Sequence, residues 1–226
     1  MNDLTATELA TRLGVTKRHA TDLLARKAIA GRQLSSGAWL ADSDSVAHYE
    51  SAARRGRGRQ LDVDTAWGLL WELSGLHAEW LAPSTRSRVR ARIRNTQAEE
   101  IARAVAGRTR AHRFRAANAT KAATGLIATG RAAASVLGVG LMNDTREVSG
   151  YTRHESAADY ALKNFMVADS SGHDVIYDNT LPIDYAADVM PPAVIAADLA
   201  VSTDTRERSG GLRGLDDLRR AWLASH

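Results

Sequence analysis

A short segment rich in arginine and glycine, at residues 54–60, constrains the fold of this chain more than any other feature. It reads RRGRGRQ and holds four arginines and two glycines. Such a segment has few apolar atoms to bury, which predicts a linker between domains. A chain of 226 residues allows one or two domains. We therefore expect an N-terminal domain at residues 1–53 and a C-terminal domain at residues 61–226.

The first 27 residues have the pattern of two short helices joined by a tight turn. Thr5 and Glu8 have the spacing of a capping box. Gly14 permits a sharp turn, because glycine adopts positive φ at little cost. Thr16 is placed to cap the second helix. The inner face of that helix is then formed by Ala20, Leu23 and Leu24. This arrangement is typical of a helix-turn-helix.

Residues 29–41 predict a β-hairpin behind these helices. Two short apolar-alternating runs flank the turn Ser35-Ser36-Gly37. Trp39 lies on the apolar side of the hairpin, so we expect it to pack against the helices. A further helix is expected from Asp42 or Ser43 to about residue 53. Together these elements predict a winged helix-turn-helix.

The C-terminal domain begins with a helical part at residues 61–107. Apolar spacing predicts helices within residues 62–82, broken near Gly75, and another helix starting at Pro83. Gly107 is the expected stop. The apolar stripe before it consists of Val89, Ile93, Ile101 and Val105.

The remaining residues mix short strands and helices. We expect a strand at 108–115, a helical section at 126–141, a strand or turn at 147–152 and a helix from 156. Residues 166–178 predict a strand, a Ser-Ser-Gly turn and a second strand. A helix follows Pro191-Pro192. The last helix is marked by Leu212, Leu215, Leu218 and Trp222. The fold class is therefore α+β: a winged helix-turn-helix joined to a mixed α/β domain.

Charge is distributed unevenly along the chain. Residues 1–60 and residues 61–120 each hold 10 Lys and Arg against 6 Asp and Glu, whereas residues 121–226 hold 10 against 14. A basic first half suits a polyanion, and an acidic second half suits a different partner.

The second helix carries the candidate DNA-reading residues near its N-terminus. Arg18 has the side chain to bind guanine O6 and N7 bidentately, and Lys17 can hold a phosphate. The full set on this helix is Thr16, Lys17, Arg18, His19 and Thr21. On the hairpin, the candidates for backbone contacts are Arg32, Ser35 and Ser36. In the linker, the candidates for a minor groove are Arg55, Arg57 and Arg59.

Five further arginines alternate along one predicted helix. They are Arg86, Arg88, Arg90, Arg92 and Arg94. On a helix they spread over two flanks around the apolar stripe. A solvated helix face or contact with an acidic partner is favoured over a second nucleic-acid surface.

Signals for an enzyme are weak, and we expect no catalytic residue, cofactor or metal. Zero cysteines exclude disulfides, Cys-ligated zinc and thiol catalysis, and the seven histidines lack HExxH spacing. The neighbours Ser171, His173 and Asp174 fit a turn better than a triad, and no GxSxG is present. Gly138-Val139-Gly140 lacks the third glycine of a dinucleotide loop. The alternating acids Asp169, Asp174 and Asp178 are expected to be solvated.

The sequence also predicts a cytoplasmic protein without a membrane partner. The opening MNDLTATELATRLG lacks the apolar core of a signal peptide. No run of about 18 apolar residues exists to span a bilayer. The lack of cysteine suits a reducing compartment.

The whole chain resembles the AbiEi-like antitoxins of type IV toxin–antitoxin systems, in their actinobacterial form. The opening TATELATRLGVTKRHATDLLARKAIAGRQLSSGAWL resembles their winged helix-turn-helix, and RVRARIR with AEEIARAVAGRTRAHRFRA resembles their linking region. The tail is similar through LIATGRAAASVLG, SGYT, VADSSGHDVIY and AADLAVSTDTRERSGGLRGLDDLRRAW. The N-terminal domain alone equally resembles MerR-like or excisionase-like readers.

This resemblance implies a transcriptional autorepressor that reads promoter DNA repeats with its N-terminal domain. It also implies that the C-terminal domain neutralises a cognate nucleotidyltransferase-like toxin. The alternative is a sequence-specific DNA-binding regulator whose C-terminal domain binds a small ligand or mediates dimerisation.

Overall fold

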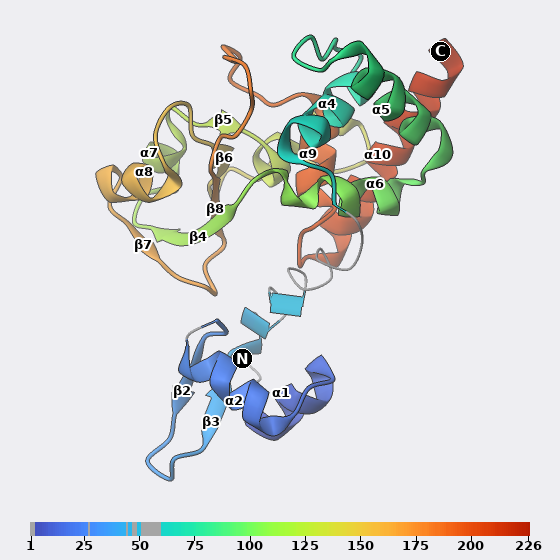
Figure 1. Ribbon diagram of the computed structural model, residues 1–226. Coiled ribbons are helices and arrows are strands. Elements are labelled where there is room, and N and C mark those ends of the chain that lie inside the picture. The colour runs from blue at the N-terminus through green and yellow to red at the C-terminus, as the bar shows by residue number, and fades with distance from the viewer. Residues whose placement is uncertain (1–2, 27, 44, 47–48, 51–59) are drawn as a thin grey trace.

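The computed structural model is an α+β protein with two separate sheets (Figure 1). It describes residues 3–26, 28–43, 45–46, 49–50 and 60–226. The predicted linker arginines Arg55, Arg57 and Arg59 lie outside the described residues. We refer to the described residues up to 50 as the N-terminal unit and to residues 60–226 as the C-terminal unit.

The N-terminal unit combines two helices with a three-stranded antiparallel sheet. Its elements are β1 (Leu4–Thr5), α1 (Ala6–Leu13), α2 (Lys17–Ala25), β2 (Gly31–Gln33) and β3 (Trp39–Ala41). The expected hairpin is present as β2 and β3, and β1 joins it in the order β1-β3-β2. The sequence did not predict β1, because two residues are too short to show alternation.

The core of the N-terminal unit comes from its own residues. Leu9, Leu24 and Ile29 are fully buried there, and Trp39 packs against them half-buried, as expected from the hairpin pattern. The expected helix after the hairpin begins where the Asp42 carboxylate accepts a hydrogen bond of 2.7 Å from the backbone N–H of Ser45. That bond confirms Asp42 as the cap.

A layer of helices forms one side of the C-terminal unit (Figure 1). Its members are α4 (Val63–Leu73), α5 (Pro83–Asn95), α6 (Ala98–Val105), the 3₁₀ turn η1 (Ala106–Arg108), the 3₁₀ segment η2 (Gly130–Leu137), α9 (Pro192–Leu199) and α10 (Thr205–Ser225). Seven of the eight residues of α9 are buried, which fits a helix that is apolar all round. α10 packs along α9 closely enough that a Cβ at Gly211 would lie 2.6 Å from the Ala196 carbonyl oxygen.

A five-stranded sheet and two short helices complete the C-terminal unit. The elements are β4 (Ala111–Ala116), α7 (Ala119–Ala123), β5 (Ile127–Ala128), β6 (Ser149–Tyr151), α8 (Ala157–Lys163), β7 (Met166–Ala168) and β8 (Asp174–Tyr177). The strand order is β5-β6-β8-β4-β7, and only the β6–β8 pair is parallel.

The two faces of this sheet contribute to different apolar cores. Tyr151 and Tyr177 point into the core shared with the helical layer, whereas Phe114 and Ile176 point into a smaller core beneath α7 and α8. This alternation follows from the period of two along a strand. Figure 1 shows the two groups of helices on opposite sides of the sheet.

Two expected helical stretches take another form. Residues 76–82 are not helical, because the chain turns at Gly75 and the Leu76 N–H bonds back to the Trp71 carbonyl at 3.0 Å. The apolar section at 126–141 forms β5 and the 3₁₀ segment η2 instead of an α-helix. Non-helical backbone at Ala133 interrupts η2.

Two further expectations on connectivity are corrected. The helix expected from Pro83 onwards is divided in two, because Thr96 adopts an extended conformation with φ −125° and ψ 140°. The two strands within residues 166–178 exist but do not form a hairpin with each other. β4 lies between them, paired with both β7 and β8. Local alternation finds strands, but it does not show which strand lies beside which.

Candidate nucleic-acid interface

The turn between α1 and α2 fixes the start of the predicted reading helix. Gly14 is in the left-handed region at φ 66°, and the Val15 N–H bonds to the Ala10 carbonyl at 3.0 Å. The side chain of Thr16 then caps α2 by accepting a 3.3 Å hydrogen bond from the His19 N–H. Because Thr16 acts as the N-cap, its hydroxyl oxygen already accepts a hydrogen bond within the chain.

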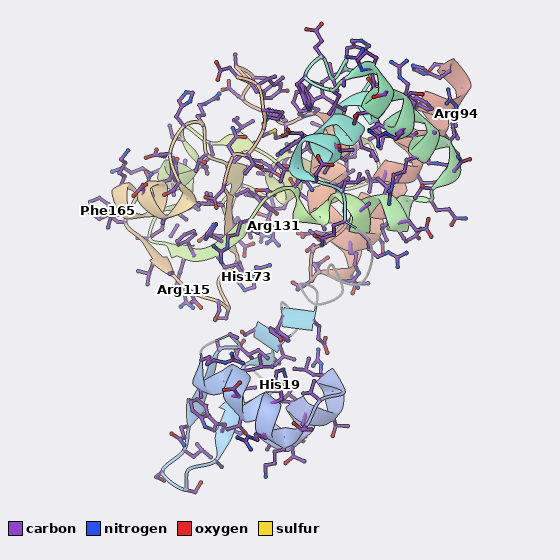
Figure 2. The ribbon with its side chains drawn as sticks, in the orientation of Figure 1. His19, Arg94, Arg115, Arg131, Phe165 and His173 are labelled. Carbon is purple, nitrogen blue, oxygen red and sulfur yellow. The ribbon has the colours of Figure 1, made fainter. Side chains whose placement is uncertain are left out.

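The first turn of α2 presents basic side chains to solvent. Lys17, Arg18 and His19 are exposed, while Ala20 behind them is fully buried in the core. Figure 2 shows His19 on the N-terminal unit. Among the described residues, none of these three side chains forms an ion pair or a side-chain hydrogen bond. They also lie at a helix N-terminus, where the exposed N–H groups and the helix dipole favour anions.

Of the other predicted DNA-binding residues of this unit, two already form contacts within the chain and two lie at the hairpin tip. The Thr21 hydroxyl donates a 2.9 Å hydrogen bond to the Lys17 carbonyl, and Thr21 is only half-exposed. Arg32 pairs with Asp3 at 3.0 Å, although 69% of its side chain remains exposed. Ser35 and Ser36 are exposed at the hairpin tip. The structure thus leaves one basic cluster without partners at the start of α2, whereas the predicted hairpin residues lie on β2 and at the hairpin tip.

Arginine in the C-terminal unit is used differently. Arg108 is buried and pairs with the buried Asp198. The same carboxylate accepts a hydrogen bond of 2.7 Å from the Thr129 hydroxyl and bonds of 3.1 Å from the Tyr151 hydroxyl. The Arg108 guanidinium also lies 5.2 Å from the centroid of the Trp67 ring, a cation–π distance. This network connects the helical layer to the sheet.

Burial sets the protonation of this network. It raises the pKa of the Tyr151 hydroxyl well above 10, so the hydroxyl stays protonated and donates to the carboxylate. Burial also raises the pKa of Asp198 from 3.8, against the opposing effects of Arg108, Thr129 and Tyr151. Sequence reasoning missed this network. The available signal was an aspartate inside the apolar helix AVIAADL.

Four of the five alternating arginines of α5 contact other groups of the chain, and among them Arg88 donates to the Thr85 hydroxyl at 3.1 Å. Arg90 donates a 2.9 Å hydrogen bond to Glu72, a carboxylate that is only 3% exposed. Arg94 lies over the Trp222 ring at 5.4 Å from its centroid, and Arg86 donates to the Leu81 carbonyl at 3.1 Å. Arg90 therefore pairs with a carboxylate of its own chain, and the predicted contact of this run with an acidic partner stays a prediction.

A cavity of about 740 Å³ lies beside the sheet of the C-terminal unit. The residues around it on this unit include Arg113 and Tyr177 from the strands, Arg131 from η2, and Ser202 and Glu207 near α10; Ala28, Ser45 and Tyr49 of the N-terminal unit also line it. Arg131 ion-pairs with both Glu147 and Glu207, so its charge is neutralised locally.

The side chains considered for catalysis or cation binding form hydrogen bonds to different partners. Ser171 donates to Asp169 at 2.7 Å, whereas the Asp174 carboxylate accepts hydrogen bonds of 2.7 Å from the N–H groups of Ala116 and Val148. Asp178 faces His112 at 2.7 Å. Each acid therefore has separate partners, and Asp174 is buried rather than solvated as expected, because it accepts hydrogen bonds from two backbone N–H groups. Across the described part of the chain, no group of three or more His, Asp or Glu side chains is placed to hold a metal ion.

No described helix has the length and apolar character needed to span a bilayer.

Comparison of the chain with protein-family models, with curated proteins and with solved structures found no match.

Proposed function

We propose that this protein is a DNA-binding transcriptional autorepressor that also acts as an antitoxin against a nucleotidyltransferase-like toxin. In this proposal residues 1–53 form a winged helix-turn-helix and residues 54–60 follow the DNA as an arginine arm. The observation that carries the DNA-binding half is the exposed cluster of Lys17, Arg18 and His19, which has no described partner and lies at the N-terminus of α2.

Three features of the N-terminal unit support a helix that enters the major groove. The Gly14 turn separates α2 from α1, the buried face of α2 packs against α1 and the sheet, and its basic face is left to solvent. A reading helix places its N-terminal side chains against base edges. Arg18 is the candidate for guanine, and Lys17 for a phosphate. The β2–β3 hairpin then takes the place of the wing, with Arg32 and its exposed guanidinium as a backbone contact.

A gel-shift titration of the full chain on its own promoter DNA tests the DNA-binding half. Arg18→Ala should cost about 1–3 kcal/mol on the promoter and relax its specificity. Lys17→Ala should weaken all DNA sequences alike and lower the salt slope by about 0.9. Arg26→Ala is the matched control, because Arg26 lies at the other end of α2, is 63% exposed and pairs with Asp22 at 2.5 Å. Equal affinities for all four proteins would remove α2 as the reading helix.

The antitoxin half rests on the resemblance of the tail segments to AbiEi-like antitoxins. It is tested by co-expressing the chain with the product of the neighbouring gene and scoring growth. Rescue of growth by the full chain, retained by Arg18→Ala, supports neutralisation that does not depend on DNA reading. A neighbouring gene that is harmless when expressed alone removes the antitoxin role and leaves the repressor role standing.

The second candidate is a regulator whose C-terminal unit binds a small ligand or mediates dimerisation. The specific observation in its favour is the cavity beside Arg113, Tyr177 and Arg131. Pockets of this size are typical of small-molecule sites. A metabolite screen by thermal shift distinguishes the two candidates, because a ligand raises the unfolding temperature of the protein that binds it.

A further inference from the structure

The solvent face of α2 carries an acidic residue next to its basic start. Residues three or four positions apart lie on one face of a helix. Arg18, Asp22 and Ala25 have this spacing, and all three are exposed. We call these three residues the reading strip. It contains one cation, one carboxylate and one small side chain.

The buried residues of α2 show that the reading strip faces directly away from the core. The opposite side of the helix fills the core of the N-terminal unit with Ala20, Leu23 and Leu24. Lys17 and His19 are the sequence neighbours of Arg18, so each is turned by about 100° from it, one to either flank. A helix that enters the major groove in this orientation turns the reading strip toward the base edges and its flanks toward the two phosphate backbones.

The Asp22 carboxylate keeps one oxygen available. Arg26 contacts its Oδ2 atom at 2.5 Å, and 51% of the Asp22 side chain is exposed. Within the described part of the chain, the Oδ1 atom accepts no hydrogen bond. Arg18, one turn earlier, also has no described partner. The reading strip therefore offers a fork of donors at Arg18 and one acceptor at Asp22.

An acceptor at this position discriminates between bases. Cytosine presents its N4 amino group as a donor in the major groove, whereas guanine presents the acceptors N7 and O6 and thymine the acceptor O4. Adenine presents a donor beside an acceptor. A carboxylate is attracted by the donor of cytosine and repelled by the acceptors of guanine and thymine.

The negative charge also weakens binding to the wrong DNA. Phosphates attract Lys17 and Arg18 in every sequence, but they repel Asp22 in every sequence. Specific binding often depends on such a repulsive element, because it weakens the complexes in which no compensating contact forms. The exposed pair with Arg26 adds little stability by itself.

We propose that Asp22 is a specificity-determining residue of α2, which accepts a hydrogen bond from the N4 amino group of a cytosine in the major groove. Arg18 binds a guanine from the same strip. Four residues of helix rise by about 6 Å, and successive base pairs are about 3.4 Å apart. The two bases should therefore lie about two base pairs apart. This inference rests on the proposed DNA-binding function.

The base preference is tested by selecting binding sites from duplexes with a random central segment, with the full chain as the selecting protein. Sites selected by the wild type should contain the guanine and the cytosine. Asp22→Asn should replace the cytosine by adenine, because asparagine bonds bidentately to adenine N6 and N7. Asp22→Ala should lose the preference at that position. Both variants should still select the guanine.

A gel-shift titration then measures the discrimination. The two DNAs are a duplex selected by the wild type and a duplex of random sequence. Both Asp22 variants should bind the random duplex more tightly than the wild type does, because a repulsive charge is removed. The ratio of the two affinities should fall by about tenfold.

The chain offers a matched control in the C-terminal unit. Asp216 of α10 forms the same kind of pair with the arginine four residues later, Arg220, at 2.6 Å. Asp216→Asn removes the same charge and should leave both the selected sites and the affinity ratio unchanged. Arg18→Ala should lose the guanine and keep the cytosine. Because Asp22 is exposed, its variants should unfold at nearly the wild-type temperature.

Three results would overturn the proposal. They are wild-type sites without the cytosine, Asp22 variants that select the wild-type sites, and an equal effect of Asp216→Asn. If Arg18→Ala loses the guanine while the Asp22 variants change nothing, the proposed DNA-binding function stands and only the role of Asp22 is wrong. If the wild type selects no sequence at all, the proposed function itself is wrong, and this inference fails with it.

Discussion

The start of α2 and the helical layer of the C-terminal unit use the same residue type, arginine, in opposite ways. On α2, Arg18 is exposed and has no described partner, and Lys17 beside it is equally free. In the C-terminal unit, Arg108 is buried against Asp198, and Arg219 of α10 donates to the carbonyls of Ile93 and Arg94 at 2.7 and 2.6 Å. The start of α2 thus leaves two cations available to a ligand, whereas Arg108 and Arg219 join elements of the C-terminal unit.

This difference shows why charge counts do not locate a nucleic-acid surface. Residues 61–120 hold as many basic and acidic residues as residues 1–60. Yet Arg86, Arg90 and Arg94 of α5 contact their own chain. A cation that already faces a carboxylate or a carbonyl gains less from a phosphate than a free one. Accessibility and pairing, rather than number, distinguish the first turn of α2 from α5.

The largest expected effect tests the internal use of arginine. Asp198→Ala should destabilise the C-terminal unit by about 3–5 kcal/mol, because it leaves the buried Arg108 without its counter-charge. The measurement is urea unfolding followed by tryptophan fluorescence, since Trp67, Trp71, Trp80 and Trp222 all lie in this unit.

A double variant separates charge from packing in that experiment. Arg108→Met combined with Asp198→Leu removes both charges and should recover much of the lost stability. Arg88→Ala, on the exposed side of α5, should change stability by less than about 0.5 kcal/mol. A small effect of Asp198→Ala would show that the buried pair does not hold the helical layer to the sheet.

A smaller effect tests whether the N-terminal unit is stabilised independently. Gly14→Ala should destabilise that unit by about 1 kcal/mol, because φ at this position is 66° and no neighbouring atom would obstruct the added Cβ. Gly14→Asn should lose less, because asparagine tolerates the left-handed region. Unfolding is followed by ¹⁹F NMR after labelling with 5-fluorotryptophan. Trp39 is the single tryptophan of residues 1–60, so its signal reports on this unit alone. If the Trp39 signal and the other four change together, the two units are coupled and the comparison fails.

The smallest effect concerns a surface ion pair of the C-terminal unit. Hydrogen bonds from the Arg146 side chain and backbone lower the pKa of Asp144 from 3.8 to about 2. A lowered folded-state pKa stabilises the fold above pH 3.8, and this contribution is lost as the pH falls through about 2. The change in stability should be small, because the Arg146 side chain is 87% exposed. Carboxyl NMR should find the low pKa in the wild type and a value closer to 3.8 in Arg146→Ala.

Local rules predicted most elements and much of the candidate interface. The capping box of Thr5 and Glu8 is present, with the Thr5 N–H donating to the Glu8 carboxylate at 2.8 Å. α9 starts at Pro192, immediately after the Pro191 N-cap. These signals work because caps, prolines and periodic apolar residues act within a few residues of each other. The domain boundaries at residues 53 and 61, and the DNA-binding role itself, stay predictions.

The sequence by itself determined most of the helices and strands, which depend on local patterns. It also determined the basic residues at the start of α2 and the uneven distribution of charge along the chain. Only the tertiary structure decided that β4 separates β7 from β8, that Asp198 meets Arg108, and that Phe165 and Val167 remain exposed at an edge. The physical reason is distance along the chain. Capping and periodicity involve neighbours, whereas strand order, buried ion pairs and exposed patches depend on residues that folding brings together from far apart.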